Sequence, residues 1–101
     1  MKQCCKDYLT EQFGDEEVVN EIYAEYVKSV QEKLPELEAA LTTENWSALD
    51  QLAHAVKGNA LATGDTEVAN VAVSLRSAAK MSEKDTASSL FAKLKDLTKD
   101  I

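Results

Sequence analysis

Apolar side chains recur every three or four residues from residue 16 to residue 41, and this spacing restricts the fold more than any other feature of the chain. Residues spaced in this way share one face of an α-helix, so the stretch predicts one long amphipathic helix over about 16–41. Pro35 removes a backbone hydrogen bond inside the pattern, and because the spacing continues beyond it we expect a bend and not an end. The apolar positions are Val19, Ile22, Tyr23, Tyr26, Val30, Leu34, Leu37 and Leu41.

Boundary signals divide the rest of the chain into four further helices. We expect them over about 3–12, over about 44–63, from just after residue 65 or 66 to about residue 80, and over about 83–99. Glycine ends a helix readily, and Asp, Thr and Ser side chains cap its beginning. The expected boundary residues are Gly14, Asp15, Thr42 or Thr43, Gly64, Asp65 or Thr66, and Ser82.

These segments predict an all-α fold. Three glycines and one proline among 101 residues leave little material for the turns of a sheet. The connections are short, so consecutive helices run antiparallel, and four apolar stripes give an up-down-up-down four-helix bundle that the short first helix caps at one end. The length fits one domain over residues 1–101. The stripes after the long helix are Leu49, Leu52, Ala53, Val56 and Ala60; Val68, Val71, Ala72, Leu75 and Ala79; and Ala87, Leu90, Phe91, Leu94 and Leu97.

The charge balance excludes several kinds of partner. A net charge of -7 argues against nucleic acid, which binds clustered Lys and Arg. No stretch approaches the roughly 18 consecutive apolar residues of a membrane span, and the N-terminus lacks the apolar core of a signal peptide. We expect a cytoplasmic, monomeric protein without a membrane or nucleic-acid partner.

Cys4 and Cys5 are adjacent, and neighbouring cysteines fit disulfide geometry poorly. We interpret them as reduced thiols. A metal site needs two further ligands, and His54 is the only residue that supplies a nitrogen. The sequence therefore does not predict a metal site at the two cysteines.

His54, the single histidine, has Lys57 three residues and Gly58 four residues after it. Residues at these spacings are neighbours on a helix surface. Glycine in a helix interior costs roughly 1 kcal/mol relative to alanine, so its use beside the imidazole calls for a local reason. A surface histidine is common, a nearby lysine can serve solubility alone, and a glycine can mark tight packing. We nevertheless expect a functional patch here.

The apolar stripe of the third helix decides which way His54 points. At roughly 100° per residue, the core-forming positions lie nearly opposite His54, so the imidazole faces solvent. An exposed imidazole offers a free nitrogen lone pair, Lys57 can neutralise the charge of an arriving phosphoryl group, and Gly58 leaves room for a partner's backbone. The residues that share its face are Ser47, Asp50, Gln51, Lys57, Gly58 and Leu61.

The sequence around His54 resembles the signature of histidine-containing phosphotransfer domains, the HPt modules of multistep phosphorelays. The motif is His54-Ala-Val-Lys57-Gly58, with Gly64 ten residues after the histidine. Most of the chain follows the same family pattern. The further matching positions are Ala39-Ala40-Leu41, Asn45-Trp46, Leu49, Leu52, Ala53, Val68 and Leu75.

The resemblance implies a phosphocarrier that takes a phosphoryl group from an aspartyl phosphate on a receiver domain and passes it to another receiver. It implies that His54 is phosphorylated, that Lys57 stabilises the phosphoryl group, and that Gly58 clears the approach of the receiver. Gln51 and Leu61 flank this patch, so we expect them in the docking surface. The catalytic aspartate and magnesium belong to the receiver in this family, so the carrier needs no cofactor.

Two positions depart from the family pattern. Arg76 stands where the family often has Glu or Gln, which can accept a hydrogen bond from the imidazole, and arginine cannot accept one. We hypothesise that Arg76 donates to the phosphoryl group as a second cation beside Lys57. Asp65 follows Gly64 where a small residue is usual, and we expect it to cap the next helix.

Two other kinds of function remain open. One is an adaptor or regulator that docks receivers or kinases without carrying phosphate. The other is an independent enzyme, in which a nucleophile and an orienting acid would surround the imidazole. Ser47 and Asp50 are the only candidates on the helix face that carries His54, and both lie on the same exposed helix without a cleft. We therefore expect no independent kinase or hydrolase activity.

Overall fold

The computed structural model describes residues 1–99 and contains five helices and no strand within that range. The helices are α1 (Gln3–Phe13), α2 (Glu16–Thr42), α3 (Trp46–Thr63), α4 (Thr66–Lys80) and α5 (Lys84–Thr98). The predicted all-α class is confirmed, and Pro35 lies inside the continuous α2. The end of the predicted domain, at residues 100–101, lies outside the described residues.

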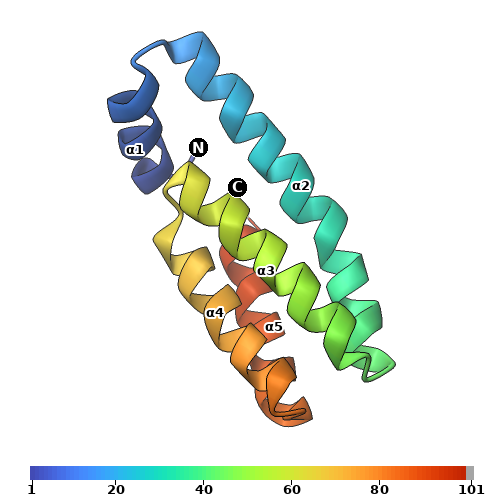
Figure 1. Ribbon diagram of the computed structural model, residues 1–101. Helices are drawn as coiled ribbons and strands as arrows, with labels where there is room; N and C mark the ends of the chain where they lie inside the picture. The colour runs from blue at the N-terminus through green and yellow to red at the C-terminus, as the bar shows by residue number, and fades with distance from the viewer. Residues whose placement is uncertain (100–101) are drawn as a thin grey trace.

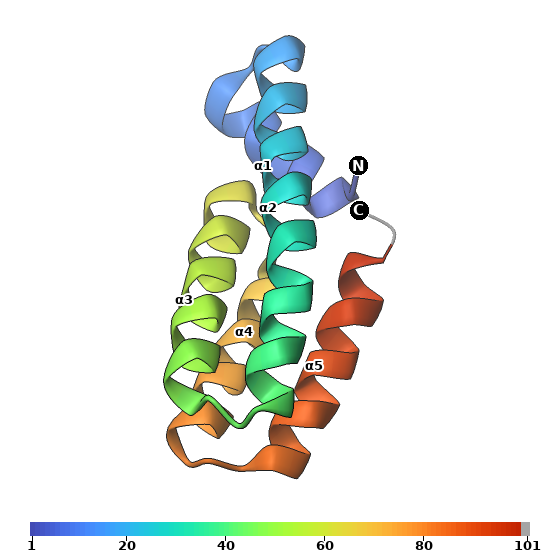
Figure 2. The same cartoon turned by 90° about the vertical axis from the view of Figure 1, so that its right-hand side faces the viewer.

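Helices α2 to α5 form the predicted up-down-up-down bundle (Figure 1). α3 packs against α2 on one side and α4 on the other, and α5 closes the bundle against α4 and α2. The molecule measures 42 × 20 × 19 Å, with α2 running along the long axis. α1 and the first turns of α2 lie beyond one end of the other three helices (Figure 2), so the short helix caps the bundle as expected. Within residues 1–99, no helix is long and apolar enough to cross a membrane.

The predicted apolar stripes form the core. Every stripe residue is buried or partly buried against the buried cluster, and α3 and α4 contribute several alanines to their common seam. Small side chains let two helices approach closely, which fixes the rotation of α3 about its axis. Because the stripe of α3 faces inward, its opposite side is presented to solvent.

Polar side chains and glycines set most helix ends where the sequence placed them. Asp15 accepts a hydrogen bond from the Glu17 amide at 2.9 Å, and Asp65 accepts one from the Val68 amide at 3.4 Å. Gly14 and Gly64 end α1 and α3 with φ of 73° and 82°, which favours glycine. The expected capping role of Asp65 is confirmed.

The predicted cap at Thr42 or Thr43 is wrong. α2 runs through Thr42, and the Thr43 hydroxyl donates to the Ala39 carbonyl at 2.8 Å, so it satisfies the end of α2 and not the start of α3. Asn45 caps α3 instead, accepting from the Ala48 amide at 3.2 Å, and the helix begins at Trp46. The amide side chain lies three residues before the donor, the usual capping distance.

The predicted cap at Ser82 is also wrong. Ser82 lies in the turn after α4 with φ of 53°, and its amide donates to the Ala79 carbonyl at 3.1 Å. Glu83 occupies the N-cap position of α5 and makes no side-chain capping bond. Ser82 therefore lies one residue before the N-cap of α5, in left-handed backbone, whereas an N-cap residue ordinarily has extended backbone.

Asp65 also joins α1 to the bundle. Its carboxylate, 1% exposed, accepts hydrogen bonds from Lys2 Nζ and from the Tyr26 hydroxyl, both at 2.8 Å. Tyr8 of α1 occupies the space beside Gly64 that a side chain on that glycine would need. We call Lys2, Tyr8, Tyr26, Gly64 and Asp65 the α1 joint.

The two cysteines are free thiols, as predicted, with their sulfur atoms 3.9 Å apart. Cys4 is exposed, whereas Cys5 is fully buried beside the α1 joint. Burial, together with the neighbouring Cys4 and Asp65, raises the pKa of the Cys5 thiol to about 12.

Candidate functional site

His54 lies on the outer face of α3, and its side chain is exposed. Its neighbours Ala53 and Val56 are fully buried on the opposite side of the helix. The predicted outward orientation of the imidazole is therefore confirmed. It follows from the rotation of α3, which the packing of its apolar stripe determines.

The other predicted site residues of α3 share this face. Gln51, Gly58 and Leu61 are exposed, and the exposed fraction of Leu61 is 50%, which is high for a leucine. Lys57 is half-buried at the edge of the face. We call His54, Gln51, Lys57, Gly58 and Leu61 the α3 face.

Neither the backbone conformation of Gly58 nor its packing within the molecule requires a glycine. It lies inside α3 with ordinary helical backbone, and a Cβ built on it would meet nothing within 4 Å. Tight packing inside the molecule is the usual reason for a glycine in a helix, and that reason is absent here. The open space above Gly58 adjoins the imidazole, so the backbone of another molecule can come close to the ring.

Hydrogen bonds to the neighbouring helices define the two flanks of this face. On the α2 side, the Asn59 side-chain amide donates to Ser29 Oγ at 2.8 Å. On the α4 side, Arg76 Nε donates to Asp50 Oδ1 at 2.9 Å. Lys57 lies two helical turns after Asp50 and therefore shares the α4 flank.

Arg76 lies on the flank where the sequence hypothesis needs it, but the structure also gives it a partner. The side chains of Arg76 and Asp50 are 25% and 27% exposed. The Arg76 Nη groups make no hydrogen bond within residues 1–99, so they remain available to an anion. The sequence placed Asp50 on the helix face that carries His54. It gave no sign of the Asp50–Arg76 pair, because these two residues are 26 positions apart.

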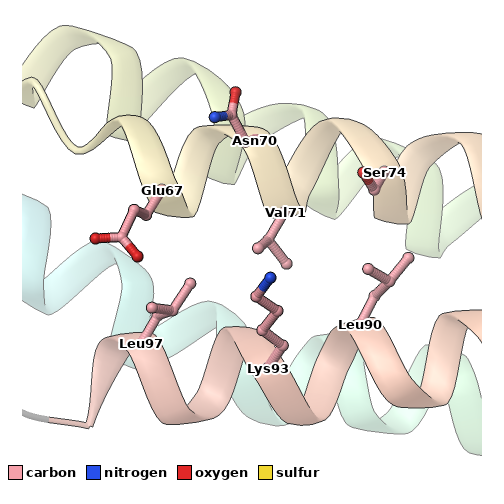
Figure 3. Close-up of a pocket in the computed structure, with 7 residues that line it drawn as sticks. All are labelled: Glu67, Asn70, Val71, Ser74, Leu90, Lys93 and Leu97. Carbon is pink, nitrogen blue, oxygen red and sulfur yellow. The ribbon is translucent and has the colours of Figure 1, made fainter.

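Cavities elsewhere in the molecule do not contain the α3 face. The groove in Figure 3 lies between α4 and α5, and the Glu67 and Lys93 side chains reach into it from the two helices. A second groove, between α2 and α3, is lined by Tyr26, Ser29 and Asn59 among others, without His54. Residues 1–99 also hold no group of three His, Cys, Asp or Glu side chains placed to bind a metal ion. His54 lines neither of these grooves and is exposed on the outer face of α3, where a group brought by another protein can reach it.

The comparison with protein families gives one match, the Hpt domain, over residues 21–101. No curated protein and no solved structure matches the chain. The matched range begins within α2 and includes α3, α4 and α5, while α1 precedes it. The match covers most of the chain, and the helical bundle with an exposed histidine agrees with it. The chain therefore belongs to the Hpt domain family, the phosphotransfer modules of phosphorelays.

Proposed function

We propose that this protein is a phosphocarrier that accepts a phosphoryl group on His54 from the aspartyl phosphate of one receiver domain and passes it to the aspartate of another. The observation that carries this proposal is the open space above Gly58, beside an exposed imidazole. The proposal includes a cytoplasmic, monomeric domain over residues 1–101 without kinase or hydrolase activity of its own.

The transfer needs one nucleophile from this chain. A neutral ring nitrogen of His54 attacks the phosphorus of the aspartyl phosphate with its lone pair, and the bond from phosphorus to the carboxyl oxygen breaks. The receiver regains its aspartate carboxylate, and the phosphoimidazole keeps the proton on its other nitrogen. The reverse sequence of bond changes delivers the group to the second receiver.

Two cations on the α4 flank stabilise the transferred group. Lys57 is one turn from His54, so its ammonium group can pair with phosphoryl oxygens. Arg76 donates through its Nη groups, while its Nε holds Asp50. These two side chains thereby supply positive charge to the phosphoryl group.

Gly58, Gln51 and Leu61 form the docking surface for the receiver. Gly58 lets the receiver approach the imidazole, Leu61 offers an apolar anchor beside it, and Gln51 offers hydrogen bonds. All three are exposed on α3 and flank His54 along the helix. A receiver that seats its active-site opening over His54 covers them together.

The test is transfer from phosphorylated receivers of the source organism to the purified protein, measured by loss of receiver phosphate and gain of phosphate on this chain. We expect no phosphorylation with ATP alone, uptake of one phosphoryl group from a cognate receiver, and no uptake by His54→Gln. Asn20→Gln, an exposed change on α2, is the matched control and should behave as wild type. Uptake by His54→Gln, or failure with every receiver, would contradict the proposal. Binding and signalling that persist in His54→Gln would assign the adaptor role instead.

A further inference from the structure

We propose that Asp50 positions the His54 imidazole by accepting a hydrogen bond from its Nδ1–H, and that Arg76 holds the Asp50 carboxylate in place for this contact. The inference rests on the phosphotransfer role proposed above and names a residue of this chain that orients the imidazole for it. It concerns a positioning residue, because Asp50 acts on the phosphoryl group through the ring.

The geometry of α3 brings Asp50 and His54 together. The two residues are four positions apart, the spacing at which side chains of a helix are neighbours. Side chains on a helix lean toward its N-terminus, so the imidazole leans over the turn that carries Asp50. Both residues lie on the outer side of α3, with His54 exposed and Asp50 half-buried.

The ion pair with α4 fixes one carboxylate oxygen and leaves the other. Arg76 Nε donates to Oδ1 of Asp50 at 2.9 Å, while Oδ2 accepts no hydrogen bond within residues 1–99. An exposed aspartate on a helix ordinarily moves between rotamers, and the bond to α4 restricts this motion. In the structure His54 and Asp50 form neither a hydrogen bond nor an ion pair with each other, and the exposed imidazole must turn toward Asp50 for Oδ2 to accept its Nδ1–H.

A carboxylate at this position selects one form of the neutral imidazole. The proton stays on Nδ1, facing Oδ2, and the lone pair of Nε2 points away from α3 toward solvent. When Nε2 forms its bond to phosphorus, the ring becomes cationic, and the adjacent carboxylate stabilises that charge. Enzymes commonly orient a reacting side chain through a hydrogen bond to a neighbouring group, and here Asp50 would orient the nucleophile His54 in this way.

Arg76 resolves the electrostatic conflict that Asp50 alone would create. An unpaired carboxylate one turn from His54 would repel a phosphoryl group, and the guanidinium compensates for that charge. Lys57 makes no ion pair within residues 1–99, so its charge remains for the phosphoryl group beside the Nη groups of Arg76. This arrangement accounts for Arg76 on α4, at a position where the family often has Glu or Gln. The hydrogen-bond acceptor for the imidazole is then Asp50 of α3.

The direct test is the tautomer of His54, read from nitrogen chemical shifts and long-range couplings at a pH where the ring is neutral. His54 is the only histidine in the chain, so its signals need no assignment. We expect the Nδ1–H form to predominate in the wild-type protein, against the Nε2–H preference of imidazole in water. Asp50→Ala should restore the preference found in the urea-unfolded chain, and Asp50→Asn, which keeps an acceptor oxygen, should restore part of the wild-type ratio.

Transfer kinetics give the second readout. We expect Asp50→Ala to slow phosphoryl uptake roughly tenfold or more, with receiver affinity unchanged, because a misplaced nucleophile loses rate and not binding. Arg76→Ala should shift the tautomer ratio part of the way. Glu36→Ala, an exposed acidic residue on α2, is the control and should change neither quantity.

The outcomes separate this inference from the proposed function. A tautomer ratio that is the same in Asp50→Ala and the wild type would overturn the role of Asp50, whatever the transfer rate does. So would an Asp50→Ala protein that keeps the wild-type transfer rate while Arg76→Ala loses it, because Arg76 would then act through its Nη groups on the phosphoryl group and not through Asp50. The tautomer measurement needs no receiver, so failure of phosphotransfer itself would appear separately.

Discussion

Two aspartates within residues 1–99 pair with a cation from another helix or from the N-terminal segment, and their surroundings differ sharply. Asp65 is 1% exposed and accepts from Lys2, Tyr26 and the Val68 amide, so its hydrogen-bonding capacity is used inside the molecule. Asp50 is about a quarter exposed and accepts from Arg76 alone within residues 1–99. A saturated buried carboxylate stabilises the fold, whereas a partly open one beside an exposed imidazole is available for chemistry.

The two glycines of α3 and its C-cap repeat this contrast. Gly64 has φ of 82° and lies against Tyr8, so both backbone and packing require glycine. Gly58 has helical backbone and empty space around it. The α1 joint is thus built for internal contact, and the α3 face is built for contact with something outside the molecule.

The largest expected effect is on the α1 joint. Asp65→Ala removes the cap of α4 and leaves the buried Tyr26 hydroxyl without its acceptor, so we expect the free energy of unfolding to fall by about 3 kcal/mol. The matched change at the other pair, Asp50→Ala, should cost less than about 1 kcal/mol, because that pair is partly exposed. Urea unfolding of both variants measures the difference. Equal losses would remove the distinction between the two pairs.

Alanine at the two glycines should have effects of opposite sign. Gly64→Ala forces a side chain into left-handed backbone and against Tyr8, which we expect to cost about 2 kcal/mol. Gly58→Ala should raise stability by about 0.5–1 kcal/mol, because alanine is the better helix former and the site is open. Thermal and urea unfolding test this sign. A Gly58→Ala protein less stable than wild type would show that the glycine serves the fold.

Leu61→Asp should weaken receiver binding about tenfold, or about 1.4 kcal/mol, while leaving the unfolding free energy within about 0.5 kcal/mol of wild type. Leu61 is exposed on the α3 face, so the added charge meets the receiver and not the core. Met81→Asp is the control, since Met81 is 72% exposed in the turn after α4. Calorimetric titration with a receiver measures the affinities, and circular dichroism checks helicity. A loss of helicity in Leu61→Asp would mean that its side chain is needed inside.

The last expected effect is absent at neutral pH and appears only in alkali, as a loss of stability through Cys5. Its pKa is about 12 in the folded protein against 9.0 for an unperturbed thiol, so between these values the unfolded chain releases a proton that the folded chain keeps. Stability is fully present below pH 9 and falls above it, by up to about 1.4 kcal/mol per pH unit. Cys5→Ala should remove this part of the slope, and Cys4→Ala should reduce it without removing it, because burial is the largest cause of the raised pKa and Cys4 contributes after it. Unfolding measured from pH 8 to pH 11 gives the slopes, and identical slopes in wild type and Cys5→Ala would contradict the assignment.

The sequence predicted what depends on neighbours along the chain. The spacing of apolar residues gave the five helices and the outward direction of His54, because both follow from helical periodicity. The caps at Thr43 and Ser82 were wrong, since the Thr43 hydroxyl and the Ser82 backbone serve the preceding helix. Local composition contains no information on which of two adjacent helix ends a polar group will satisfy.

Contacts between distant residues could not be predicted. Lys2 and Asp65 are 63 positions apart, and Asp50 and Arg76 are 26 positions apart. Each pair depends on how two elements dock, which no periodic pattern specifies. For the same reason Asp65 was predicted as a cap but not as the anchor of α1, and Asp50 was placed on the correct face without its partner.

The measurement that tests the account most directly is the location of the phosphoryl group after incubation with a phosphorylated receiver. The protein is digested and mapped by mass spectrometry at alkaline pH, where phosphohistidine survives, and compared with an acid-treated sample, where it does not. The account predicts one phosphoryl group, on the peptide that carries His54, present in the alkaline sample and lost in acid. A phosphoryl group that maps to another residue, or a receiver that binds the α3 face and leaves His54 unmodified, would contradict it.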